Sequence, residues 1–249
     1  MTSFPTPRPI LIDASLSGDL AVPDEARVLA LVVHPNLASM ARSGHCFLAD
    51  VLRSNRVATL SIGLRTLDEE RGNADLPDSG EVARRLRRVQ AWLAQASTTR
   101  HLRLGLIAVD DAVTPCIEAS RLPGLDAVRA LVAIDGHPDL RQEAVADWRW
   151  PTLCLAGRNG WPGQARSDRL PRTLPAPHRL VRLVERTLPS AGCGAFQAIA
   201  CEATSWLAHT VPQAQVVQLR RPAPVSNVVP VVDAMRRWGA VPLCVEPAA

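Results

Sequence analysis

Two adjacent carboxylates, Asp110 and Asp111, directly follow an apolar run at residues 103–109 that has the length and composition of a buried strand. A carboxylate in that position can attack an electrophilic carbon, accept a proton or help to bind a divalent cation. Consecutive side chains at a turn usually diverge. We therefore expect at least one of the two to be solvated or to cap the following helix, and a metal site shared by both is the less favoured interpretation.

His34 is the candidate for proton transfer beside Asp110. It follows a second apolar run, at residues 27–33, which is rich in leucine and β-branched residues. Imidazole is the usual general base near neutral pH. If both runs are parallel strands of one sheet, their carboxyl ends meet at the same edge, so His34 is expected at the mouth of the crevice beside Asp110.

The hydrophobic pattern predicts a scaffold of alternating strands and helices around these residues. A hairpin is expected first, with strands at 10–16 and 19–22 and a turn at Ser17-Gly18. Further strands are predicted at 27–33, 57–64, 103–109, 128–135, 151–157 and 179–185, and helices at 46–55, 79–96, 112–121 and 194–208. This alternation predicts an α/β fold, a mostly parallel doubly wound sheet with an antiparallel N-terminal hairpin.

The last forty residues have a different character. Residues 1–209 are predicted to form the α/β domain, and residues 210–249 a small βαβ extension. The segment from 225 to 246 faintly resembles half of a CBS nucleotide-binding motif, and a functional module of that kind needs two halves. We therefore interpret the extension as an added sheet edge or a dimer contact.

Several short segments, in the same order along the chain, resemble one enzyme family. They read LSGDLAVPDEARVLALVVHPN at 16–36, LRTLDEE at 64–70, GHPDL at 136–140 and PTLCLAGRNG at 151–160. Together with the helix ending at Trp206, they resemble dienelactone-hydrolase-like α/β-hydrolases over roughly residues 8–208. The resemblance implies the α/β-hydrolase fold, with a nucleophile, an acid and a base carried at strand ends.

The resemblance fails at the nucleophile. The family places a serine, or in related members a cysteine, in G-x-S-x-G on a strained turn between a strand and a helix. The corresponding segment here is GLIAVDDA at 105–112, so Asp110 takes the nucleophile position, and Ala108 and Ala112 replace both glycines. A serine esterase mechanism is excluded at this turn.

The positions of the acid and the base are also degenerate. Asn159 stands at the acid position, and an asparagine cannot supply the negative charge that stabilises an imidazolium. Counting back without gaps from Trp206 places Leu188 at the position of the base, and no histidine lies between His178 and His209. The general base of the family is therefore missing.

These losses favour a catalytically inactive hydrolase-fold protein that serves as a structural or protein-interaction subunit. One alternative is a hydrolase of altered chemistry. Haloalkane dehalogenases and epoxide hydrolases of this fold use an aspartate nucleophile, which Asp110 resembles, with His34 or a metal ion assisting. The family treats the residue at His34 as structural, however, and Pro35 replaces its usual glycine partner. A second alternative is a small-molecule-binding module that keeps the old crevice.

Composition narrows the remaining possibilities. A net charge of +4 is too small to indicate a nucleic-acid partner, and the six scattered cysteines form no CxxC pair, so we predict free buried thiols, no metal site and no cofactor. The longest apolar run, 28–33, is too short to span a bilayer, and the N-terminal residues do not resemble a secretory signal. We therefore expect a cytoplasmic protein without membrane insertion.

The tryptophans and the last forty residues bear on possible partners. A protein partner or a homo-oligomer is expected, through the tryptophan-rich segment that holds Trp148, Trp150 and Trp161 or through the extension. Core packing is nevertheless the default interpretation for these tryptophans.

Four arginines, at positions 84, 85, 87 and 88, interleave with apolar positions at helical spacing. We interpret them as the solvated face of the helix at 79–96.

Overall fold

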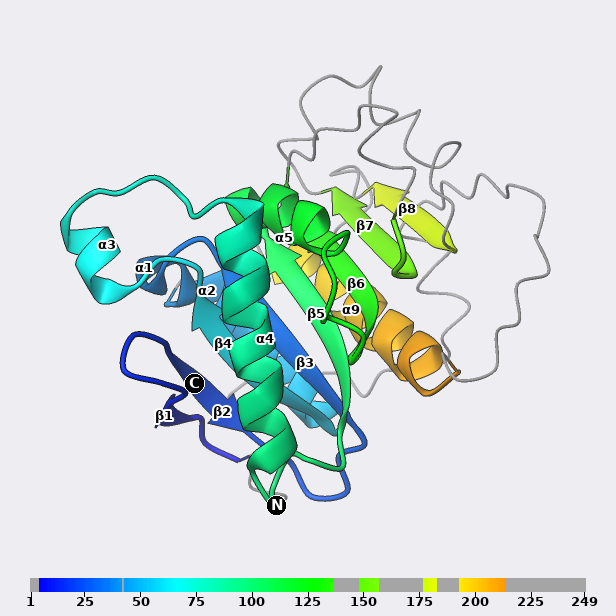
Figure 1. Cartoon of the computed structure of the whole chain (residues 1–249). Helices are drawn as coiled ribbons and strands as arrows, with labels where there is room; N and C mark the ends of the chain where they lie inside the picture. Colours follow the sequence, from blue (N-terminus) through cyan, green and yellow to red (C-terminus); the bar gives the residue numbers. More distant parts are fainter. Residues whose placement is uncertain (1–4, 42, 137–147, 157–176, 183–192, 214–249) are drawn as a thin grey trace, which may run out of the picture.

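The computed structural model describes residues 5–41, 43–136, 148–156, 177–182 and 193–213 (Figure 1). These residues form one eight-stranded sheet with the order β1-β2-β4-β3-β5-β6-β7-β8. The strands are β1 (Arg8–Leu11), β2 (Ser17–Ala21), β3 (Val28–His34), β4 (Val57–Gly63), β5 (Arg103–Val109), β6 (Val128–Ile134), β7 (Thr152–Ala156) and β8 (His178–Arg182). The pairings β1–β2 and β2–β4 are antiparallel and all others are parallel, which confirms the expected fold class.

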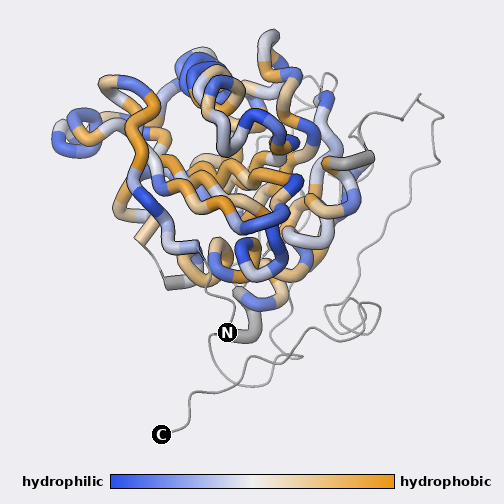
Figure 2. The backbone as a smooth tube through the Cα atoms, turned by 90° about the horizontal axis from the view of Figure 1, so that it is seen from below, coloured by the Kyte–Doolittle hydropathy of each residue, from blue (hydrophilic) through white to orange (hydrophobic). Residues whose placement is uncertain are grey.

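Helices cover both faces of the sheet, two on each face, and a separate hydrophobic core lies between each face and its helices (Figure 1). One face carries α4 (Ser79–Gln95) and α5 (Val113–Ala119), and the other carries α2 (Ser43–Ser54) and α9 (Cys193–Gln213). The central strand β3 is buried at all seven positions, which is why its sequence is continuously apolar rather than alternating. The hydropathy colouring of Figure 2 shows hydrophobic residues concentrated in the strands in the middle of the molecule.

Short elements complete the edge of the sheet at which the parallel strands end. They are α1 (Leu37–Met40), α3 (Leu67–Arg71) and the 3-10 turn η1 (Asp110–Ala112). Helix α3 begins with a reciprocal capping box, in which Thr66 Oγ1 accepts from the Glu69 N–H and Glu69 accepts from the Thr66 N–H. This cap fixes the path of the chain from β4 toward α4.

The expectation of a fully solvated arginine face is wrong at one position. Arg85 is only 4% exposed, and its guanidinium donates to Glu69, to Glu81 and to the backbone carbonyl of Leu64. Arg84 and Arg88 are exposed, as expected. Arg85 is buried because α3 lies beside α4 and supplies a carboxylate, which periodicity within α4 cannot reveal.

The predicted hairpin turn at Ser17-Gly18 is also wrong, because both residues lie inside β2. A Cβ at Gly18 would lie 2.5 Å from the Ser61 carbonyl oxygen, so the glycine permits close approach to β4 rather than a turn. The chain reverses instead between β1 and β2, where Asp13 Oδ1 accepts from the backbone N–H groups of Ser15 and Leu16.

The remaining expectations about burial have mixed outcomes. Trp148 and Trp150 are buried core residues, and Trp148 Nε1 donates to Thr152 Oγ1 at 2.8 Å, whereas Trp161 lies outside the described residues. Cys116 and Cys154 are buried as expected, but Cys46 is exposed. Among the described residues, no helix combines the length and apolar character needed to cross a membrane.

Helix α9 continues to Gln213, past the boundary predicted at residue 209. The rest of the predicted extension, residues 214–249, lies outside the described residues. Its βαβ structure and the division of the chain into two units therefore stay predictions.

Candidate functional site

Asp110 sits at a sharp turn between β5 and α5. Its backbone adopts φ 51°, a left-handed conformation that is strained for most side chains and that aspartate tolerates better than most. The turn η1 begins at this residue, and α5 follows at once. The structure thus places Asp110 at the tip of a strand-to-helix elbow at the carboxyl edge of the sheet, with 30% of its side chain exposed.

Small residues pack tightly around this elbow. Ala108 and Ala112, which precede and follow Asp110 by two residues, are completely buried. Gly136, just after β6, abuts the first residue of α5, because a Cβ at Gly136 would lie 2.1 Å from the Cβ of Val113. Such packing leaves the elbow little room to relax, and strained backbone persists only where its surroundings hold it.

A histidine that the sequence analysis did not select, His45, faces the elbow from the start of α2. Its Nε2 lies 3.9 Å from Asp110 Oδ2, longer than a hydrogen bond and within the range of an ion pair. Its Nδ1 lies 2.7 Å from the Ser39 carbonyl oxygen, which can only accept, so Nδ1 carries a proton. In the neutral ring the lone pair is therefore on Nε2, on the side of Asp110.

His34 lies where the sequence predicted it, at the carboxyl end of β3, and it is 1% exposed. Its ring stands against that of His45, with centroids 5.0 Å apart and planes tilted by 56°. His34 therefore packs against the His45 ring, and it is His45 that approaches Asp110.

Two amides of the loop between β3 and α2 donate to side chains of the protein. The Leu37 N–H donates to Glu70 Oε1 at 2.5 Å, and the Ser39 N–H donates to Asn36 Oδ1 at 2.7 Å. In α/β-hydrolases this loop contributes one of the two N–H groups that stabilise an oxyanion. Here these two donors are bound to side chains of the protein itself.

The other candidate groups add no metal ligand set or reactive thiol beside Asp110 in the described part of the chain. Asp111 is exposed, whereas the Asp110 side chain faces His45. Among the described residues, no three side chains of the metal-ligating types gather into one group. Burial raises the pKa of the Cys116 thiol to about 12, so that thiol stays protonated at neutral pH.

The structure brings together only part of the predicted site. Asp110 and His34 lie at the same edge of the sheet, whereas Asn159 and Leu188 fall outside the described residues. His45 could have been found from the sequence, because a helix that follows a parallel strand begins at the edge where that strand ends. That rule places the first residues of α2 beside the end of β3.

Comparison with known proteins gives a consistent picture of the fold. No family model matches the chain. A dienelactone hydrolase from Anabaena variabilis superposes with a TM-score of 0.73 at 26% identity, over 84% of this chain and all of that one. The protein Est1E from Butyrivibrio proteoclasticus superposes with a TM-score of 0.59 at 11% identity, over 85% of this chain and all of that one.

Two curated relatives, from two strains of Mycobacterium tuberculosis, each carry the name "Putative phosphoribosyl transferase". They are 31% identical to this chain over 142 residues, which is 57% of this chain and 32% of theirs. The chain thus spans about a third of the length of these relatives. The structural similarities show that the chain has the α/β-hydrolase fold, and they confirm the expected resemblance to dienelactone hydrolases.

Proposed function

We propose that this α/β-hydrolase-fold chain does not hydrolyse acyl esters and acts instead as an interaction subunit. One observation carries the proposal. The strand-to-helix elbow holds the carboxylate of Asp110, at the position that the resemblance to dienelactone hydrolases assigns to a hydroxyl or thiol nucleophile. A carboxylate that attacked an ester would form an anhydride, which is more reactive than the ester it replaced, so no stable acyl-enzyme would accumulate.

The surroundings of Asp110 support the same conclusion. The Leu37 and Ser39 amides already donate to Glu70 and Asn36, so a developing oxyanion would have to displace a protein side chain from either of them. Cys116 offers no substitute nucleophile, because it is completely buried. A tetrahedral intermediate would therefore lack its attacking group, and neither of these two amides would be free to stabilise it.

The curated relatives support an interaction role. In them, the segment similar to this chain makes up about a third of a protein whose name describes phosphoribosyl transfer. A hydrolase-like unit thus occurs there within a longer chain, beside sequence that this chain does not match. We propose by analogy that this chain works together with a second protein, and that a partner handling phosphoribosyl groups is the first candidate.

We predict that the purified full chain does not turn over p-nitrophenyl acetate or butyrate faster than its Asp110→Ala variant. Release of p-nitrophenol measures the rate, and circular dichroism confirms that both proteins are folded. Turnover that disappears in a folded Asp110→Ala variant contradicts the proposal.

For the interaction role, affinity purification of the tagged chain from its native cell extract should yield a stoichiometric partner that survives salt washing. A monomer without copurifying protein contradicts the interaction role.

The contact between His45 and Asp110 favours one alternative, a hydrolase of altered chemistry. In that mechanism Asp110 displaces a leaving group from a saturated carbon and forms an ester bond to the enzyme. His45 Nε2 then accepts a proton from a water that attacks the acyl carbon of this ester, which releases an alcohol and regenerates the carboxylate. The separation of 3.9 Å and the protonated Nδ1 are compatible with that role for His45.

This alternative makes its own prediction. A His45→Gln variant incubated with 1-bromobutane or styrene oxide should retain the alkyl group on Asp110, because the second step lacks its base. Intact-protein mass spectrometry followed by peptide mapping detects the added mass. An Asp110→Asn variant is the control that cannot form the ester. If His45→Gln gains no mass with either reagent, this chemistry is dismissed.

A further inference from the structure

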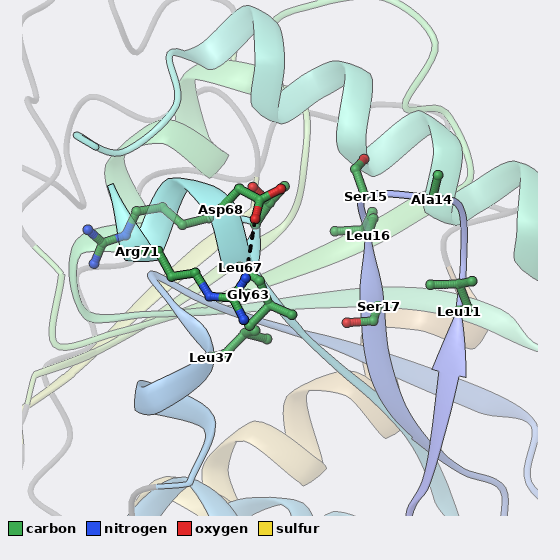
Figure 3. Close-up of a pocket in the computed structure, with 12 residues that line it drawn as sticks. Leu11, Ala14, Ser15, Leu16, Ser17, Leu37, Gly63, Leu67, Asp68 and Arg71 are labelled. Atoms are coloured by element: carbon green, nitrogen blue, oxygen red, sulfur yellow. Dashed lines mark ion pairs between the residues drawn. The ribbon is translucent and has the colours of Figure 1, made fainter. Parts of the chain in front are cut away.

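A concave site lies between the β1–β2 hairpin and α3. It is a cavity of about 230 Å³ that is lined from the hairpin, the end of β4, the start of α1 and the segment 65–71. Figure 3 shows Leu11, Leu16 and Ser17 on the hairpin side, with Leu37 and Leu67 facing them. Asp110, His34 and His45 do not line it.

The apolar part of this cavity is unusually open to solvent. Leu11 and Leu67 are 67% and 53% exposed, and they are the large hydrophobic side chains most exposed in the described part of the chain. They come from elements that are far apart in sequence, yet both border the same cavity. Solvated leucines that converge on a hollow favour an apolar ligand group between them, because its binding removes their surface from water.

The polar part is cationic. Arg65 and Arg71 line the cavity with a single carboxylate, Asp68, whose contact with Arg71 is 3.6 Å long and highly exposed. Arg65 is half-buried, and its Nη1 donates to the Ala74 carbonyl at 3.0 Å. Its Nε is buried and has no hydrogen-bond partner among the described residues, so this guanidinium keeps donor capacity that those residues do not use.

From this combination we infer that the cavity binds a small amphipathic carboxylate. An arginine fork matches a carboxylate geometrically, and the leucines suit a short hydrocarbon tail. At about 30 Å³ for each water-sized group, 230 Å³ holds roughly eight non-hydrogen atoms. A carboxylate with about five further carbons fills that volume. This binding site goes beyond the proposed function and does not depend on it.

Isothermal titration calorimetry of the full chain with hexanoate tests the inference. We expect one saturable site with a dissociation constant on the order of 1 mM, and much weaker binding of neutral 1-hexanol and of inorganic phosphate. The Arg65→Gln variant should weaken hexanoate binding about tenfold, and Leu67→Ser should weaken it severalfold. Arg56→Gln, at the opposite end of β4 from Gly63, is the matched control and should bind as the parent does.

Each other outcome of this experiment overturns the inference. Absence of saturable binding does so, as does equal affinity for hexanoate and 1-hexanol, or binding that Arg65→Gln and Leu67→Ser both leave unchanged. Because Arg65 also holds the Ala74 carbonyl, its variant is checked for folding by circular dichroism. If Arg65→Gln does not fold, the exposed positions decide the question through Leu67→Ser and Leu11→Ser, whose side chains are mostly in solvent.

Discussion

Replacing Glu69 by glutamine is expected to lower the free energy of unfolding by about 2 kcal/mol at neutral pH. Glu69 receives two hydrogen bonds from the Arg85 guanidinium, at 2.9 and 2.6 Å, and these join α3 to α4. The Arg85 side chain is only 5% exposed, so the substitution leaves a buried cation with Glu81 as its remaining carboxylate partner. Breaking a fully buried pair costs about 3–5 kcal/mol. We expect less because a third of the Glu69 side chain is in solvent.

The effect should depend on pH in a defined direction. Hydrogen bonds from Arg85 hold the pKa of Glu69 at about 2, well below its ordinary 4.5, although burial acts in the opposite direction. A carboxylate whose pKa is lowered by folding stabilises the protein above its unfolded-state pKa, and this contribution is lost as the pH falls through the folded-state value. The stability difference between the parent and Glu69→Gln should therefore be constant above about pH 4.5 and shrink toward pH 2.

Urea unfolding followed by circular dichroism at several pH values measures this difference. Glutamine still accepts a hydrogen bond from the Thr66 N–H, so the variant tests the charge more than the helix cap. Arg71→Gln, on the same short helix, is the matched control. Its contact with Asp68 is exposed at both ends, so it should change stability by less than about 0.5 kcal/mol. Equal effects of the two substitutions would contradict a stabilising role of the buried pair between Glu69 and Arg85.

Replacing Gly136 by alanine is expected to destabilise the protein by about 3 kcal/mol and to disturb the elbow. The added Cβ would lie 2.1 Å from the Cβ of Val113, an atom attached directly to the backbone of α5. No side-chain rotation can relieve that contact, so either α5 or the end of β6 must move. Because α5 follows η1 at once, a shift of α5 also moves Asp110.

Two measurements check this prediction. Denaturant unfolding gives the loss of stability, and the NMR signals of the His45 ring report movement at the elbow, since that ring lies beside Asp110. Gly80→Ala is the control, because the nearest atom to its added Cβ is Asp78 Oδ1, at 3.2 Å on a side chain. It should change stability far less. An alanine at position 136 that leaves both stability and the His45 signals unchanged contradicts the packing described for the elbow.

The amino-acid sequence by itself determined the layered architecture. The continuous apolar run of β3, and the similar runs that became β4, β5 and β6, predicted buried parallel strands, since local composition reflects burial on both faces of a sheet. The same pattern placed Asp110 directly after a strand, and the resemblance to dienelactone hydrolases implied that this residue stands where the family has a serine. These features depend on residues close together in the chain, so they can be read without a structure.

Only the tertiary structure decided which side chains meet. Arg85 is buried because α3 brings Glu69 to α4, and Gly18 is required by the approach of β4 rather than by a turn. His45 reaches Asp110 because α2 begins at the edge where β3 and β5 both end. Each of these contacts joins residues from separate elements, and its partner is set by sheet order and packing. Periodicity within a single element carries no information about such a partner.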